Sequence, residues 1–214
     1  TTVDEQMQFL GEKIKNMAPS REDLAKSKEQ LKEKIRPLNY AEWSKVIESN
    51  FPQGVFEAEA CVSAIAQLRI KDIANPYGLI LVGPPSSLKT TILNFFSESN
   101  IAYRTDYFTP SSFVSHHAKY KSETLEEIDL LPRIKDKVLI VPDLGCIFGM
   151  KQEDLLRNIS ILTRLYDGQG LFLDSAVHGR RGYPGPVMFV MLSGTTPIPH
   201  RVWNVMGTLG ARLF

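Results

Sequence analysis

Hydrophobic residues along the chain recur in two alternating patterns. Short apolar runs bounded by turn residues occupy 78–82, 137–141 and 187–192, and each is typical of a strand that is buried on both faces of a parallel sheet. Residues 89–97 and 154–166 instead carry apolar side chains at helical spacing. Strands that alternate with helices predict an α/β fold with a parallel sheet covered on both faces.

Four weaker patterns complete the predicted core. Residues 40–49 and 55–70 are expected to form helices ahead of the first strand. Residues 101–104 are expected to form a short strand. Thr109-Pro110 resembles a helix start, and we extend that helix to residue 116.

The first 36 residues have a different composition. They are rich in Lys and Glu, and their apolar residues recur at helical spacing on both sides of Pro19-Ser20. This pattern predicts an arm of two amphipathic helices at 1–36, followed by a core domain at 37–214. The arm is either a solvated helical hairpin that leans on the core or a surface for oligomerisation or a protein partner.

Charge and composition narrow the possible functions. The 25 basic and 24 acidic residues leave a net charge of +1, so binding to nucleic acid would need a local basic patch. The chain has no run of ~18 apolar residues and no apolar leader after Thr1, so we expect no membrane association and a cytoplasmic location. Cys61 and Cys146 are then expected to be buried thiols in a reducing compartment.

A phosphate-binding loop joins the first predicted strand to the helix at 89–97. Such a loop needs backbone amides that converge on phosphate at a helix N-terminus, a Lys for the β- and γ-phosphates, and a hydroxyl for Mg²⁺. The spacing from Gly83 to Lys89-Thr90 fits this P-loop motif. The predicted ATP-binding residues are Gly83, Pro84, Pro85, Ser86, Ser87, Leu88, Lys89, Thr90 and Thr91.

One position of the loop departs from the motif. Leu88 stands where a glycine usually precedes the Lys, and glycine allows the backbone to approach the phosphate closely. A leucine there must take an allowed conformation and point its side chain away. The alternative is a degenerate loop that binds no nucleotide.

An acidic residue follows the buried run at 137–141. Asp143 is placed to hold Mg²⁺ together with Thr90, and its alternative role is to cap the following turn. The next residue is Leu144, where many ATPases have a Glu that orients the attacking water. Three other acidic residues are poorly placed to orient the water: Glu153, Asp154 and Asp106. The sequence therefore supports nucleotide binding better than hydrolysis.

With these motifs in place, residues 40–214 resemble the AAA+ superfamily of P-loop ATPases. The run 190–197 is similar to its sensor-1 strand, which implies that Thr195, or next Thr196, contacts the γ-phosphate or the attacking water. The run 207–214 is similar to its arginine-finger segment, which implies that Arg212 completes a neighbouring subunit's site. The alternative for Arg212 is a surface salt bridge. From this resemblance we expect the C-terminal lid of the superfamily to be absent or truncated in this chain.

A glycine-rich segment before the sensor-1-like strand carries a further resemblance. Residues 170–177 are expected to form one strand and residues 187–192 its partner, with the tip between them. This arrangement looks like the pre-sensor-1 hairpin of the AAA+ branch that includes MCM helicases, which implies contacts to DNA by His178, Arg180, Arg181 and Tyr183. The alternatives are a surface turn with solvated arginines, or an arginine that serves a neighbour's nucleotide.

These features lead to two hypotheses. The first is an oligomeric AAA+ ATPase, in a ring or filament, that uses ATP and Mg²⁺ to act on DNA as a helicase-like motor or remodeller. The second is a nucleotide-dependent switch or scaffold with little turnover, whose N-terminal helices recruit a partner. A small-molecule kinase is a weaker third possibility. A looser likeness, carried by residues 130–137, is to uncharacterised phage and mobile-element ATPases.

Overall fold

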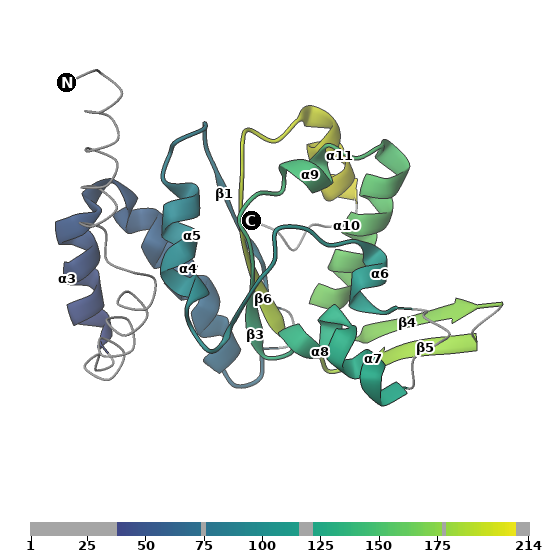
Figure 1. Cartoon of the computed structure of the whole chain (residues 1–214). Helices are drawn as coiled ribbons and strands as arrows, with labels where there is room; N and C mark the ends of the chain where they lie inside the picture. Colours follow the sequence, from purple (N-terminus) through teal and green to yellow (C-terminus); the bar gives the residue numbers. More distant parts are fainter. Residues whose placement is uncertain (1–37, 74–75, 116–121, 177–178, 209–214) are drawn as a thin grey trace, which may run out of the picture. The chain divides into compact units, whose positions relative to one another are not determined.

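The computed structural model describes residues 38–73, 76–115, 122–176 and 179–208 (Figure 1). The chain divides into two units, Thr1–Lys45 and Val46–Phe214. The predicted arm at 1–36 lies outside the described residues, and so do His178 and Arg212. The described part of the chain begins just before α3 (Tyr40–Asn50) and belongs mainly to the second unit.

A four-stranded parallel sheet is the centre of the second unit. Its strands are β1 (Leu79–Val82), β6 (Phe189–Thr195), β3 (Lys137–Val141) and β2 (Ala102–Arg104), in that spatial order. All three neighbouring pairs are parallel, so the carboxyl ends of the strands meet at one edge of the sheet. The prediction of an α/β fold with a parallel sheet is confirmed.

Helices cover both faces of this sheet, which makes three layers (Figure 1). α4 (Val55–Ala66) and α5 (Lys89–Ser97) lie on one face, and α8 (Leu130–Ile134) and α10 (Gln152–Tyr166) lie on the other (Figure 1). The remaining helices of this unit are α6 (Pro110–Phe113), α7 (Ser122–Ile128), α9 (Gly145–Phe148) and α11 (His200–Thr208), with short 3₁₀ turns at Pro52–Gly54 and Gln67–Arg69.

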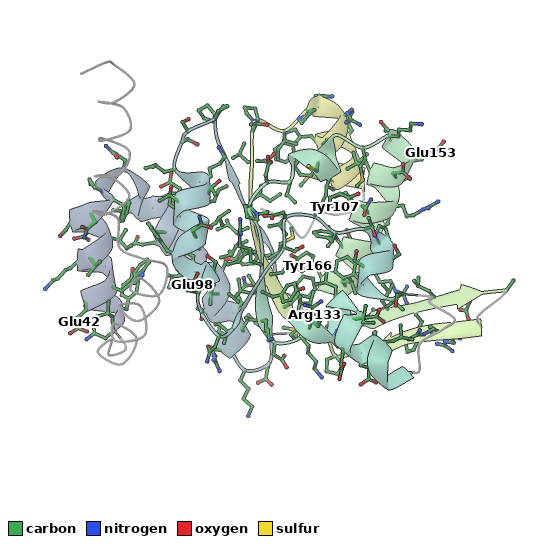
Figure 2. The ribbon with its side chains drawn as sticks, in the orientation of Figure 1. Glu42, Glu98, Tyr107, Arg133, Glu153 and Tyr166 are labelled. Atoms are coloured by element: carbon green, nitrogen blue, oxygen red, sulfur yellow. The ribbon has the colours of Figure 1, made fainter. Side chains whose placement is uncertain are left out.

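Burial of both faces of the sheet explains why its strands are continuous apolar runs in the sequence. Leu139 and Met191 join the core on the α10 side, while their neighbours, such as Ile140 and Val190, are equally buried. Each such side chain contributes roughly 1.5–3 kcal/mol by leaving water. Tyr166, at the end of α10, stacks on Phe189 of β6 with ring centroids 4.9 Å apart, among the core side chains (Figure 2).

The helix expected at 109–116 is shorter than predicted. Thr109 and Ser112 form a capping box that begins α6, as Thr109-Pro110 suggested. The helix ends at Phe113, because Val114 is extended at φ −143°. Phe113 and Val114 are both buried.

The predicted hairpin exists, but its second strand was assigned wrongly. β4 (Gly170–Ser175) pairs with β5 (Gly179–Pro184) in an antiparallel sheet of two strands, whereas residues 189–195 belong to the central sheet. The segment expected to be a loop at the tip is therefore a strand. Its glycines hid this, and one of them, Gly182, is needed for pairing: a Cβ there would lie 2.0 Å from the carbonyl oxygen of Leu171.

Among the described residues, no helix combines the length and the apolar character that a membrane span requires.

Candidate nucleotide-binding site

The loop between β1 and α5 carries the predicted phosphate-binding motif, and two of its residues have unusual backbones. Ser86 and Leu88 both have left-handed backbones, with φ of 64° and 63°. α5 then begins at Lys89, and no side chain caps its N-terminus. The amides of the first turn have no partner within the helix, so this end of α5 favours an anion.

The side chain of Lys89 folds back over the same loop. Its Nζ donates to the carbonyl oxygens of Gly83 at 2.8 Å and Pro84 at 2.7 Å, and to Oγ of Ser87 at 3.0 Å. Gly83 leaves room for this arrangement, since a Cβ there would lie 2.6 Å from the Ser87 hydroxyl. The loop therefore holds a positive charge at its centre.

Leu88 has a backbone conformation that glycine adopts more readily than other residues. At φ 63° and ψ 0° it lies in the left-handed region, where a side chain costs roughly 1–2 kcal/mol. The consequence is local backbone strain, with the leucine side chain half-buried.

The carboxyl end of β6 is hydrogen-bonded to the loops on both sides. The amide of Gly83 donates to the carbonyl of Thr195 at 3.2 Å, which ties the start of the P-loop to β6. The amide of Leu144 donates to the carbonyl of Gly194 at 2.8 Å, which ties the loop after β3 to the same strand. Three segments far apart in sequence thus meet at one edge of the sheet.

Gly194 shows how closely these segments approach. A Cβ built on Gly194 would lie 2.7 Å from the carbonyl oxygen of Pro142 and 3.6 Å from Cβ of Lys89. The stem of the loop lysine and the residue before Asp143 therefore flank the same point of β6. Thr195 follows directly and is only 3% exposed, whereas Thr196 is exposed.

Asp143 takes the capping role that was its alternative in the sequence. Its Oδ1 accepts a 2.7 Å hydrogen bond from the amide of Gly145, at the start of α9. Gly145 lies so close that a Cβ there would be 3.0 Å from Oδ1. The carboxyl group is exposed.

Arg201 of α11 is not among the predicted site residues, but it is hydrogen-bonded to the segment that follows Asp143. It donates to the carbonyl oxygens of Phe148 and Met150 at the end of α9. α11 follows β6 in the chain, so the loops after β3 and β6 are joined on their outer side as well. A basic residue at the first turn of a helix carries no sequence signal for such a contact.

The residue after Asp143 has no acidic group, and the acidic residues considered as substitutes lie on other segments. Leu144 is 2% exposed and belongs to the core. Glu153 lies in the first turn of α10 (Figure 2), and Asp106 pairs with Arg104 at 3.2 Å. Within the described ranges no cluster of three or more His, Cys, Asp or Glu residues could hold a metal by itself. A Mg²⁺ ion here would need water or phosphate oxygens to complete its shell.

A cavity of about 450 Å³ lies beside the P-loop, along the outer edge of β1 and against α4. It reaches Gly83 and Lys89, and its walls are largely apolar. Two apolar side chains that line the cavity are largely exposed to solvent: Phe56 is 79% exposed and Val82 is 50% exposed. The cavity offers apolar surface next to the predicted phosphate-binding loop.

The basic residues predicted for nucleic acid lie on the hairpin. Arg180, Arg181 and Tyr183 are all on β5. The hydroxyl of Tyr183 donates to Oδ2 of Asp129 at 2.7 Å. Burial, followed by this hydrogen bond, raises the pKa of Tyr183 above its usual value. Tyr183 therefore anchors the hairpin, while the arginines line a hollow at its surface.

No protein-family model matches this chain, and no curated protein matches it. The geometry of the site is therefore the basis on which a function can be assigned.

Proposed function

We propose that this chain is an AAA+ type P-loop protein that binds ATP with Mg²⁺, hydrolyses it, and acts as an oligomeric, DNA-associated motor or remodeller. The observation that carries the proposal is the meeting of three segments at the carboxyl edge of the sheet: the loop with Lys89 at its centre, the loop of Asp143, and the end of β6 at Gly194-Thr195. Ligands of open α/β sheets bind at this edge.

The charges of the site suit a triphosphate. Lys89 and the uncapped N-terminus of α5 supply positive charge for the phosphates, and Thr90 and Asp143 are the oxygen ligands for Mg²⁺. The ion would neutralise charge that develops on the phosphates during transfer to water. The apolar cavity beside Gly83 offers a surface for the base.

Oligomerisation and DNA binding complete the proposal. Arg212 would reach the nucleotide of a neighbouring subunit in a ring or filament, which would make turnover depend on assembly. Arg180 and Arg181 on the hairpin would contact the phosphates of DNA. The N-terminal residues 1–36 would provide a surface for a partner or for assembly.

One observation favours a different function, a nucleotide-dependent switch or scaffold with little turnover. Leu144, at the position where a water-orienting Glu follows the Asp in many ATPases, is buried in the core and has no polar atom in its side chain. Binding would then be intact while hydrolysis would be slow. The two functions share the site and differ in the fate of the γ-phosphate.

Nucleotide binding is tested first, by calorimetric titration of the chain with MgATP and a non-hydrolysable analogue. We expect Lys89→Ala to abolish binding, because phosphate then loses its only side-chain cation in the loop. Lys135→Ala, which removes an exposed lysine after α8, is the matched control and should bind normally. Equal affinity of the wild-type and Lys89→Ala proteins would overturn the proposal.

The rate of ATP hydrolysis distinguishes the proposed motor from the proposed switch. Phosphate release is measured with and without single-stranded and duplex DNA, for the wild-type, Lys89→Ala, Leu88→Gly and Arg212→Ala proteins. Turnover that DNA stimulates and that both alanine variants lose supports the motor. Tight MgATP binding without turnover in any protein supports the switch. Turnover in Leu88→Gly alone would show that the cradle is disabled at one residue.

A further inference from the structure

The short helix α9 is hydrogen-bonded at both ends to side chains from other segments. At its start, the amide of Gly145 donates to Oδ1 of Asp143 at 2.7 Å. At its other end, the guanidinium of Arg201 donates to the carbonyl oxygen of Met150 at 2.9 Å and to that of Phe148. The candidate Mg²⁺ ligand and a basic residue of α11 therefore hold the same helix, which lies beside α11 (Figure 1).

A helix as short as α9 depends on partners from outside. It is four residues long, so most of its amides and carbonyl groups lack a partner within the helix. Arg201 supplies two donors from one planar group to the carbonyl groups at the C-terminal end. A cation is favoured at that end of a helix and a carboxylate at the other, and Arg201 and Asp143 have this arrangement.

Hydrogen bonds, more than apolar packing, set the direction of α9. Ile147 and Phe148 are buried in the core, but burial of apolar surface is non-directional. The amide of Leu144 donates to the carbonyl of Gly194, which fixes the residue before the helix to β6. Arg201 is half-buried on α11, the next element after β6, and it fixes the other end. Both ends of α9 are thus held by segments at or just after β6.

We infer that Arg201 is a positioning residue for Asp143. By holding the C-terminal end of α9, Arg201 keeps the Gly145 amide where it bonds to Oδ1 of Asp143, and this leaves Oδ2 of the carboxylate for Mg²⁺. This inference rests on the proposed function, because it concerns the carboxylate proposed to bind the ion with the nucleotide. In this role Arg201 touches neither the nucleotide nor the ion.

The chemistry of Mg²⁺ agrees with a carboxylate that is bonded through one oxygen. Mg²⁺ in nucleotide sites is bound by one or two carboxylates together with water and phosphate oxygens, so one free oxygen of Asp143 is sufficient. Carboxylates that bind metals are themselves hydrogen-bonded, and their outer partners contribute to metal affinity. The Gly145 amide is such a partner, and Arg201 holds the helix that carries it.

The test measures how Mg²⁺ changes the affinity for ATP. Binding of a fluorescent ATP analogue is titrated in EDTA and then at increasing Mg²⁺ concentrations. Arg201→Met keeps an apolar stem and removes the donors. We expect this variant to need about tenfold more Mg²⁺ for half of the effect, as loss of an outer partner does, with its affinity in EDTA unchanged. Arg157→Met, which removes an exposed arginine of α10, is the matched control and should behave like the wild type.

Two further variants separate positioning from a general effect on the fold. Arg201→Lys keeps the charge and can donate to one of the two carbonyl oxygens, so its Mg²⁺ dependence should lie between those of the wild type and Arg201→Met. In an Asp143→Ala background, Arg201→Met should cause no further change in Mg²⁺ dependence, because the group through which it acts is gone. A residue that only stabilises the fold would weaken ATP binding equally in EDTA and in Mg²⁺.

Hydrogen exchange of the Gly145 amide reports the same link without nucleotide or metal. We expect Arg201→Met to raise the exchange rate of this amide toward the rate in Asp143→Ala, which lacks the acceptor. Arg157→Met should leave the rate unchanged. Thermal unfolding of each variant shows that it is folded, and Arg201→Lys carries the same comparisons if Arg201→Met does not fold.

Three outcomes overturn the inference: wild-type Mg²⁺ dependence in Arg201→Met, an equal loss of affinity in EDTA and in Mg²⁺, or the same effect of Arg201→Met in the Asp143→Ala background. A wild-type protein that binds no ATP in either condition would sink the proposed function instead. Exchange of the Gly145 amide then decides the inference. Faster exchange in Arg201→Met supports the link from Arg201 to Asp143, and unchanged exchange overturns it.

Discussion

The hydroxyl of Tyr183 donates a 2.7 Å hydrogen bond to Asp129, a carboxyl group that is only 1% exposed. The other oxygen of Asp129 accepts from the amide of Ser115 at 2.9 Å and from its hydroxyl at 2.6 Å. This one side chain therefore connects the hairpin, the α7–α8 junction and the segment after α6. A buried carboxyl group with these partners makes the position of the hairpin specific.

Tyr183→Phe should destabilise the protein, because it leaves one oxygen of buried Asp129 without its donor. We expect a loss of about 1–3 kcal/mol in the free energy of unfolding, which is a fall of about 2–4 °C in Tm for each kcal/mol. Tyr107→Phe is the control, since Tyr107 is 48% exposed, and it should unfold like the wild type (Figure 2). An equal effect of both changes would contradict this role of Tyr183.

The same bond has a dependence on pH. Because the pKa of Tyr183 is raised in the folded protein, its stabilising contribution is complete below the ordinary tyrosine pKa of about 10. The contribution is then lost as the pH rises toward the folded value. The stability difference between wild type and Tyr183→Phe should therefore be constant between about pH 7 and 9 and shrink above about 10. Denaturant unfolding at several pH values measures this difference.

Leu88→Gly should stabilise the P-loop, because glycine takes the left-handed backbone without the clash of a side chain. We expect a gain of about 1 kcal/mol, after the greater entropy of glycine in the unfolded chain is subtracted. Leu88→Ala distinguishes the effect of backbone strain from the effect of the side chain, because alanine keeps the strained backbone and lacks the larger apolar group. If thermal unfolding shows the same gain for alanine, strain at this position is not the cause.

Gly194→Ala should disturb the edge of the sheet where the candidate site lies. The new methyl group would lie 2.7 Å from the carbonyl oxygen of Pro142, which is backbone and cannot rotate away. We expect a loss of about 1–3 kcal/mol in unfolding experiments and weaker MgATP binding. Gly207→Ala is the matched control, because a methyl group there has nothing within 4 Å. A tolerated Gly194→Ala would mean that β3 and β6 separate easily at this end.

The two cysteines should react with a thiol reagent at different rates. Cys61 is buried, and burial together with the nearby Glu57 raises the pKa of its thiol to about 12. Cys146 is exposed, contrary to the sequence-based expectation that both are buried. We expect rapid labelling of Cys146 alone, followed by mass spectrometry, with Cys61 labelled only after unfolding. Cys146→Ser should then remove the rapid phase, and its persistence would refute the assignment.

The sequence by itself determined the main elements of the fold. The runs at 78–82 and 137–141 became β1 and β3, and the helix at 89–97 became α5 with the predicted bounds. These predictions held because a strand covered on both faces must be apolar at every position, and because the Lys-Thr step of the P-loop motif marks a helix start. The partner of β4 was predicted wrongly, since β5 has two glycines and no clear alternation of apolar and polar residues.

Tertiary structure alone decided which residues lie together at the site. Nothing in the spacing of Lys89, Pro142 and Gly194 shows that their atoms approach within a few ångströms, because that proximity results from the strand order β1-β6-β3. The left-handed backbone of Leu88 and the partner of Tyr183 were also decided in this way. The local pattern of apolar and polar residues indicates which residues are buried. Contacts between segments that are distant in sequence depend on how the layers pack.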